Sequence, residues 1–505
     1  MKTIQLHKTT LILIAILLFY TFMGILLPLM HDDLQWFSNY NTDILKVGFA
    51  SLNGRYIGNI FEIIAVHVSW LRWLSYGLIS MGIIWMIMHI TRCKAWTSYY
   101  LLAFSLMLIL PSAIYADTYG WFAGFYNYAT STLISLFIIY YCINAIIYKE
   151  KQPVSVTVLF YVLCFFGQLF MENVTLFHCI ILILAFLYEF TANRTLNYKL
   201  LFSFMIATIG TIIMFSNPNY RKILFEGSEY QQVSNNQGIF SKFAEMISTS
   251  LPYGVIFSQI IILSMIAALI IYLLLRSDRY VHLTILKRRI IMIGFITLPL
   301  YYLLFYNQFL LNKNTDIGLV GFVNVIVCGY FAFSIFVGIY LSINDRKTQI
   351  TLYSLLIAIC VSASTLVIVT PIEPGNFLIV YTIHVIILII LLKEFRKYKS
   401  INVNFIKVAS LVLAMIYLSA FIYVHYEHEK RVQLLKQQIK DHPRQEVYTV
   451  ESLPFEHYMH HPSPINKNYQ EWFNNYEELP KMTKVKYIPF GSDDSQLILT
   501  YKNLK

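Results

Sequence analysis

Residues 9–30 read TTLILIAILLFYTFMGILLPLM, an apolar run without a charged residue. A helix of about 20 residues rises far enough to cross the roughly 30 Å hydrocarbon core of a bilayer. That core admits only helices or closed barrels, because unpaired backbone groups find no water there. The run therefore predicts a transmembrane helix. No small-x-small cleavage pattern precedes His31, so we expect a retained helix rather than a signal peptide.

Similar runs recur along the chain of 505 residues, which is 57% hydrophobic and only 13% charged. Soluble domains carry about a quarter charged residues, so the composition excludes a soluble globular protein. The runs are continuous rather than alternating, which favours helices over a barrel. We predict an all-α polytopic membrane protein with about thirteen transmembrane helices, at residues 9–30, 72–90, 97–113, 127–147, 154–171, 174–190, 200–216, 254–274, 290–310, 317–342, 350–370, 376–392 and 404–424.

Basic residues are concentrated in every second connection between these runs, for example Arg276 to Arg289 and Lys393 to Lys399. The alternate connections hold only about six Lys or Arg residues. The positive-inside rule then predicts a cytoplasmic N-terminus and a C-terminal tail outside the cell membrane. The basic residues that give the net charge of +11 lie in these short clusters, which indicates contact with anionic lipid rather than with nucleic acid.

The composition changes after residue 424, which divides the chain into a membrane domain, 1–424, and a small extracytoplasmic domain, 425–505. The second part is polar and contains six prolines. We expect a helical stalk over residues 426–441 and short strands near 447–450 and 485–489, which makes the tail α/β. No CxxC pair occurs among the six cysteines, so neither a disulfide framework nor a zinc site is indicated.

Two acids, Asp32 and Asp33, directly follow the first run and open a long outer loop. Its apolar stretch, residues 56–68, predicts an interfacial helix that lies flat on the membrane. A carboxylate beside such a helix can accept a proton from a hydroxyl during group transfer. The alternative is that both acids are solvated groups that end a helix.

Basic residues on the same face suggest a phosphate site. A guanidinium binds phosphate through two parallel hydrogen bonds and stays ionised when poorly hydrated. Arg55 lies in the first outer loop, and Tyr220, Arg221 and Lys222 follow the end of a predicted span, after a turn formed by Asn-Pro-Asn. The alternative is that these residues only anchor the chain among lipid headgroups.

Other polar residues interrupt apolar sequence at the outer boundary. Glu172 and Asn173 break the stretch 165–187, and ionisable groups in such places are functional candidates. Asp117, Trp121, Tyr126 and Asn127 would suit a sugar, whose ring stacks on aromatic faces while its hydroxyls need polar partners. The alternative is an aromatic belt. Two glycines within this segment, Gly120 and Gly124, predict a close approach of another part of the chain.

Together these motifs resemble those of GT-C glycosyltransferases, and more narrowly the bacterial Gtr-type members that modify surface polysaccharides. Pro374-Gly375-Asn376 departs from the pattern, since an arginine often follows the proline in that family. The matching segments are Asp32-Asp33, Asn53-Gly54-Arg55, residues 121–128, residues 172–175, residues 217–221 and residues 371–375.

The resemblance implies a GT-C-like membrane domain that moves a sugar from a polyprenyl (undecaprenyl) phosphate carrier to a cell-envelope glycan acceptor, with inversion. Asp32 or Asp33 would be the base, Arg55 and Arg221 would bind the phosphate, and Glu172 and Asn173 would contact sugar or acceptor. A polyprenyl-phosphate glycosyltransferase and a flippase would be partners. No cofactor is certain, and dispersed acids allow a divalent cation, Mg or Mn, without a diagnostic spacing.

Two other functions stay open. A transporter or flippase of lipid-linked sugars would be expected to place ionisable groups near the bilayer midplane and to show inverted repeats. A polysaccharide polymerase or ligase would be expected to have large arginine-rich outer loops, whereas residues 217–253 contain only Arg221.

Overall fold

The computed structural model describes residues 2–39, 53–94, 96–220, 243–306, 317–367 and 372–492. Its first half is helical, with α1 (Lys2–Leu26), α2 (Asp32–Asn39), α4 (Tyr56–His67), α5 (Ser69–Ile90), α6 (Thr97–Leu108), α7 (Ser112–Asp117), α8 (Phe122–Gly124), α9 (Thr130–Ile146), α10 (Val154–Phe166), α11 (Glu172–Asn193) and α12 (Tyr198–Phe215). The second half has α15 (Ile260–Leu274), α16 (Asp278–Val281), α17 (Ile285–Tyr301), α19 (Ile317–Ser342), α20 (Arg346–Thr365), α21 (Leu378–Phe395), α22 (Val403–Asp441) and α23 (Lys467–Tyr476).

Short π and 3-10 turns interrupt or extend several helices. They are η2 (Phe125–Ala129), η3 (Gly167–Leu169), η4 (Met246–Ser250), η5 (Pro252–Ile256), η6 (Phe257–Gln259), η7 (Tyr302–Tyr306), η8 (Pro374–Phe377) and η9 (Glu456–Tyr458). Two strands, β1 (Val447–Glu451) and β2 (Lys484–Ile488), form a parallel pair in the tail, with Val447 opposite Lys484. They lie on the segments in which the sequence predicts strands.

Eleven helices of the described residues are long and apolar enough to cross a membrane. The chain is therefore an all-α polytopic membrane protein. The other two predicted spans coincide with shorter apolar helices, α6 and the pair α10 and η3. α6 ends at Leu108 because the residue before a proline, here Leu110 before Pro111, is disfavoured in helical conformation. The count of thirteen spans stays a prediction.

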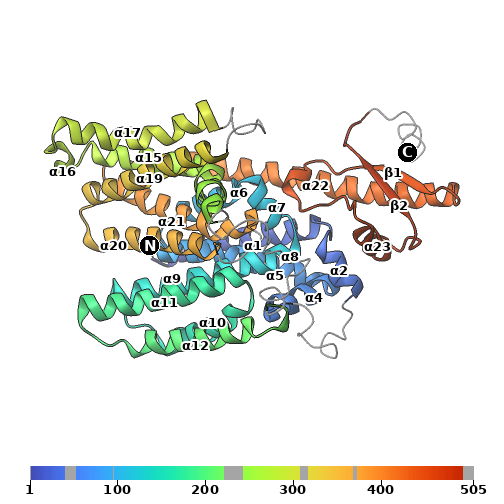
Figure 1. Ribbon diagram of the computed structural model, residues 1–505, viewed down its shortest axis with the longest axis horizontal. Coiled ribbons are helices and arrows are strands. Elements are labelled where there is room, and N and C mark those ends of the chain that lie inside the picture. Colours follow the sequence, from blue (N-terminus) through green and yellow to red (C-terminus); the bar gives the residue numbers. More distant parts are fainter. Residues whose placement is uncertain are drawn as a thin grey trace.

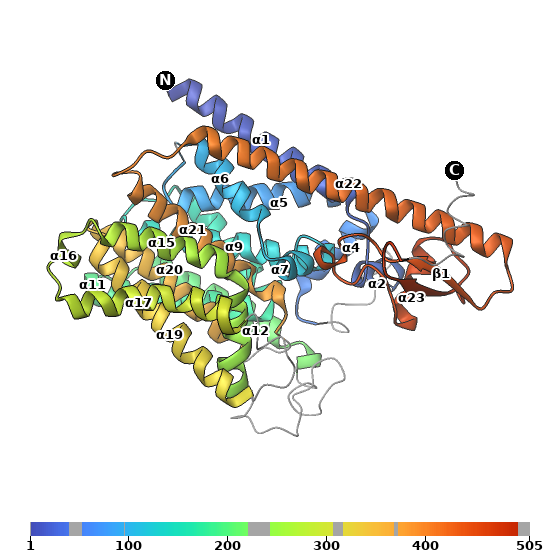
Figure 2. The same cartoon turned by 90° about the horizontal axis from the view of Figure 1, so that it is seen from above.

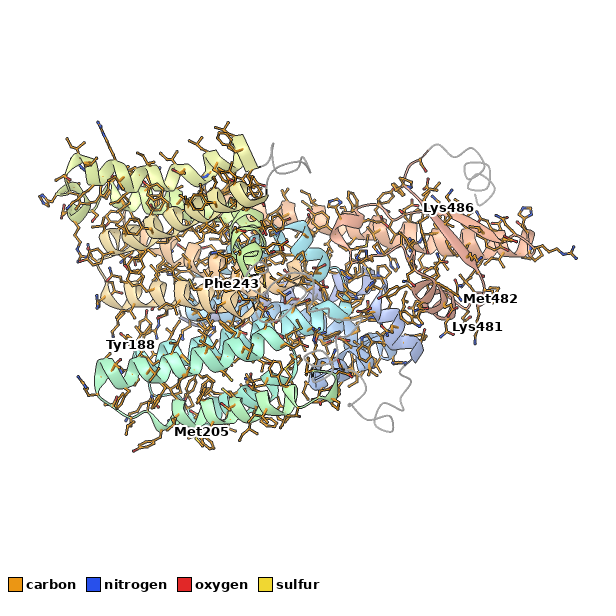
Figure 3. The ribbon with its side chains drawn as sticks, viewed as in Figure 1. Tyr188, Met205, Phe243, Lys481, Met482 and Lys486 are labelled. Carbon is orange, nitrogen blue, oxygen red and sulfur yellow. The ribbon has the colours of Figure 1, made fainter. Side chains whose placement is uncertain are left out.

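The bundle is arranged around α21, which is almost entirely buried. Its sequence is apolar on all sides, as expected for a helix enclosed by others. α15 and α20 pack against it, and α1 packs on α5 while α11 packs on α12. Apolar side chains on the outer surface stay exposed: Tyr188 and Met205 project outward from α11 and α12, whereas Lys481 and Lys486 project from the tail (Figure 3).

The predicted boundary at 424/425 lies inside α22, which runs as one helix of 39 residues from the bundle into the tail (Figure 2). The basic connection that contains α16 lies at the opposite end of the bundle from the tail (Figure 1). Short helices α2, α4, α7 and α8 lie between the bundle and the tail. This junction holds the candidate site.

Candidate functional site

A polar cavity of about 290 Å³ lies at the junction between the bundle and the tail. It collects five residues that the sequence predicted as site residues, Asp32, Arg55, Trp121, Asn127 and Glu172. The other lining residues are His31, Gln35, Trp36, Asn53, Asn59, Glu62, Ala123, Gly124, Tyr128, Met171, Glu373, Asn376, His460 and Tyr469. Segments far apart in the sequence therefore meet at one place.

The first-loop acids have different surroundings. Asp33 is fully buried at 0% exposure, and its carboxylate accepts hydrogen bonds from the backbone N–H groups of Ala123 at 2.8 Å and Met30 at 3.2 Å. Burial raises the pKa of Asp33 to about 7. Since both carboxylate oxygens accept hydrogen bonds from backbone N–H groups, Asp33 stabilises the turn between α1 and α2 and the start of α8.

Asp32 instead lines the cavity. Its Oδ1 accepts a hydrogen bond from the hydroxyl of Tyr469 at 3.2 Å and lies 3.1 Å from Nδ1 of His31. Burial acts to raise the pKa of Asp32, but His31, His460 and Tyr469 outweigh that effect, so the pKa lies below its usual value. Asp32 is therefore an ionised carboxylate that faces the cavity.

Arg55 and Glu172 form an ion pair, with 2.9 Å between Nη2 and Oε2. Nε of Arg55 also donates to both carboxylate oxygens at 3.0 Å. The hydroxyl of Tyr220 donates to Oε1 of Glu172 at 2.5 Å and accepts from the backbone N–H of Gly54 at 3.1 Å. Glu172, at the first turn of α11, therefore orients the guanidinium and ties the segment before α4 to the end of α12. Arg221 and Lys222, which follow Tyr220, lie outside the described residues.

Two further carboxylates line the cavity and were not predicted as site residues. Glu62 accepts a hydrogen bond from the side-chain amide of Asn127, and burial raises its pKa well above the usual value. Glu373 accepts from the hydroxyl of Tyr128 at 3.1 Å. A signal for Glu62 existed, because it is the only acid within the apolar segment 56–68.

The tail supplies one side of the cavity. His460 stacks on Trp121 with ring centroids 4.1 Å apart and planes at 11°, and its Nδ1 lies 2.9 Å from Oδ1 of Asp117. Tyr469, on α23, stacks on His31 at 4.2 Å. Neither contact has a local signal in the sequence, because the two partners are more than 300 positions apart along the chain.

Asp117 binds its neighbours rather than the cavity. Its Oδ2 accepts a hydrogen bond from the backbone N–H of Gly375 at 3.1 Å, while Oδ1 faces His460. Close approaches at the two glycines are confirmed. A Cβ on Gly120 would lie 2.0 Å from the carbonyl oxygen of Tyr458, and one on Gly124 would lie 2.0 Å from that of Asp117.

Two more predicted residues, besides Asp33, Asp117 and Tyr220, do not line the cavity. Tyr126 packs inward, where its hydroxyl donates to the carbonyl of Arg72 at 3.2 Å and lies 2.8 Å from Oγ of Ser75. Asn173 is buried at 2% exposure and does not line the cavity. Across the described ranges, no group of three His, Cys, Asp or Glu side chains is arranged to hold a metal ion.

The fold and the cavity define a polytopic α-helical membrane protein with a carboxylate-rich polar site at one end of its bundle. No protein-family model matches the chain, and searches of curated proteins and of solved structures found no match. An assignment of function therefore depends on the chemistry of the cavity and on the motifs of the sequence.

Proposed function

We propose that the protein is a membrane glycosyltransferase of the GT-C type, which moves a sugar from a polyprenyl phosphate carrier to a cell-envelope glycan on the outer face of the bacterial cell membrane. The observation that carries the proposal is the position of Asp32. An ionised first-loop carboxylate lines a polar cavity that is also lined by an arginine and by Trp121.

The reaction needs two kinds of charged group from the protein, one to bind phosphate and one to accept a proton. A glycosyl phosphate already has a good leaving group, so the site must bind the phosphate and receive a proton from the attacking hydroxyl. Arg55 meets the first need, because Glu172 holds its guanidinium in a fixed orientation. Asp32 meets the second need. A single displacement would invert the anomeric centre.

The remaining cavity groups suit a sugar. Carboxylates and amides from Glu62, Glu373, Asn59 and Asn376 can accept or donate hydrogen bonds to ring hydroxyls. Trp121 supplies an aromatic ring at the same wall. Clustering of these groups at one end of the bundle favours an enzyme at the membrane boundary over a transporter, whose ionisable groups would lie near the midplane.

The experiment that tests this proposal compares cell-surface glycans. A strain that lacks the protein should lose a sugar substituent, as measured by mass and linkage analysis, and wild-type protein should restore it. Asp32→Asn should not restore it, whereas Asp441→Asn, an exposed acid at the end of α22, should. An unchanged glycan profile in the deletion strain would move the assignment to transport of lipid-linked sugars.

A further inference from the structure

Among the described residues, His460 is the tail histidine that lines the cavity, beside Trp121 at the start of α8. Its ring lies flat on Trp121, and the ring of His31 meets it edge to face at 4.7 Å. Its side chain is 13% exposed and lines the cavity together with Asp32. The His460 ring is thus packed on two sides and still borders the cavity.

Asp117 determines which nitrogen of this imidazole is available. A carboxylate only accepts hydrogen bonds, so the 2.9 Å contact with Asp117 places the proton of a neutral ring on Nδ1. The lone pair is then on Nε2. Asp117 is itself held by the backbone N–H of Gly375, which keeps the carboxylate in place while the ring takes up a proton. Carboxylate, imidazole and cavity are arranged as in a general-base dyad.

Backbone strain accompanies this contact. His31 and His461 both have positive φ, 49° and 47°, in the left-handed region that a residue with a Cβ rarely adopts. Their rings lie 5.3 Å apart at the seam between tail and bundle. Strain of this kind persists where the surrounding structure enforces it, often at functional sites.

We infer that His460 is the proton acceptor of the transfer step and that Asp117 is its positioning residue. This inference rests on the proposed function and divides between two residues the role given above to Asp32 alone. Asp32 holds and orients the attacking hydroxyl, and His460 removes its proton. The C-terminal tail is then part of the active site.

The acceptor oxygen forms a bond to the anomeric carbon, and the bond from that carbon to the phosphate oxygen breaks with its electron pair leaving on the phosphate. The hydroxyl proton passes to Nε2 of His460. The resulting imidazolium is stabilised by Asp117, and the charge on the phosphate is stabilised by Arg55.

The test measures transfer by the full-length protein in lipid vesicles that contain a polyprenyl-phosphate sugar, with an acceptor glycan added outside. His460→Ala should lower the rate by about 100-fold or more. Added imidazole should restore part of the rate, because Trp121 still offers the stacking face. Asp117→Asn should also lower the rate but should not respond to imidazole. His457→Ala, an exposed histidine in the same tail segment, should match the wild type.

Each result decides the inference. Wild-type rates in His460→Ala would overturn it and leave Asp32 as the only base. Loss of activity without imidazole rescue in both His460→Ala and His460→Gly would also overturn it and would assign His460 to docking of the tail. Absence of transfer in the wild-type protein would instead overturn the proposed function, on which the inference rests.

Discussion

At the scale of single residues, Asp32 and Asp33 are adjacent in sequence but face different surroundings. Successive residues on a helix point about 100° apart, so one carboxylate reaches the cavity and the other reaches backbone N–H groups. We expect Asp32→Asn to lower transfer by at least about 100-fold. Asp33→Asn should keep transfer within a few fold of wild type. Equal loss in both variants, measured with protein that remains folded, would contradict this separation of roles.

Asp33 should also affect how stability depends on pH. Its pKa rises from 3.8 in the unfolded chain to about 7 in the folded protein, so the folded state binds more protons between these values. The contribution of Asp33 to the free energy of unfolding is fully present below about pH 4. It falls as the pH rises to about 7, by at most about 4 kcal/mol. The melting temperature of wild type relative to Asp33→Asn should therefore fall over that range. A constant difference would argue against the raised pKa.

The Arg55 and Glu172 pair gives a prediction that does not depend on function. Removal of one member leaves the other charge without its partner in a largely buried place, which costs about 3 kcal/mol in comparable cases. Arg55→Gln and Glu172→Gln should each lower the melting temperature. The double variant should lose clearly less than the sum of the two. Additive losses would show that the two side chains do not interact.

The sequence singles out residues whose charge is costly beside apolar sequence, and their roles stay predictions. Glu172 and Asp32 are charged groups beside apolar runs, and both line the cavity. His460 and Tyr469 could not be found in this way, because their roles depend on pairing with Asp117 and Asp32 across most of the chain. Hydrophobic periodicity carries no information on such distant contacts.

At the scale of elements, the docking of the tail depends on Gly120. A Cβ at this position would lie 2.0 Å from the carbonyl oxygen of Tyr458, which is backbone and cannot rotate away. We expect Gly120→Ala to displace the segment around η9 and to move His460 from Trp121. Hydrogen exchange should show faster exchange in residues 455–461 with unchanged exchange in α21. Unchanged protection of that segment would contradict the close packing seen here.

Helices were predictable where apolar runs are long, whereas the predicted span 97–113 missed the break that Pro111 causes. The helix predicted at 97–113 divides before Pro111 into α6 and α7, and α7 then carries Asp117 to His460. The sequence could not show that α22 continues through the predicted domain boundary, because residues 426–441 are polar and their helical pattern differs in composition from the span before them.

At the scale of the whole molecule, the proposed function requires the cavity and the tail to face the outside. Single cysteines at Met482, which is 84% exposed in the tail, and Leu286, which is 69% exposed near α16, report on the two ends. In a background without the six native cysteines, a membrane-impermeant maleimide should label position 482 in intact cells. Position 286 should be labelled only after permeabilisation. The reverse pattern would invert the orientation that the basic loops predict.

Whether transfer requires a metal ion is also tested on the whole protein. The carboxylates of the cavity pair with Arg55, Asn127, Tyr128 or Tyr469 instead of meeting around one point. We therefore expect transfer to continue in the presence of a chelator such as EDTA. Loss of transfer with EDTA and recovery with Mg²⁺ or Mn²⁺ would instead require a cation bound together with the substrate.

The most direct test of the central claim uses purified protein in vesicles that contain a sugar-loaded polyprenyl phosphate. Free polyprenyl phosphate should appear together with the glycosylated acceptor, in equal amounts, and Asp32→Asn should abolish both. Movement of the intact lipid-linked sugar between leaflets, without release of polyprenyl phosphate, would contradict the account.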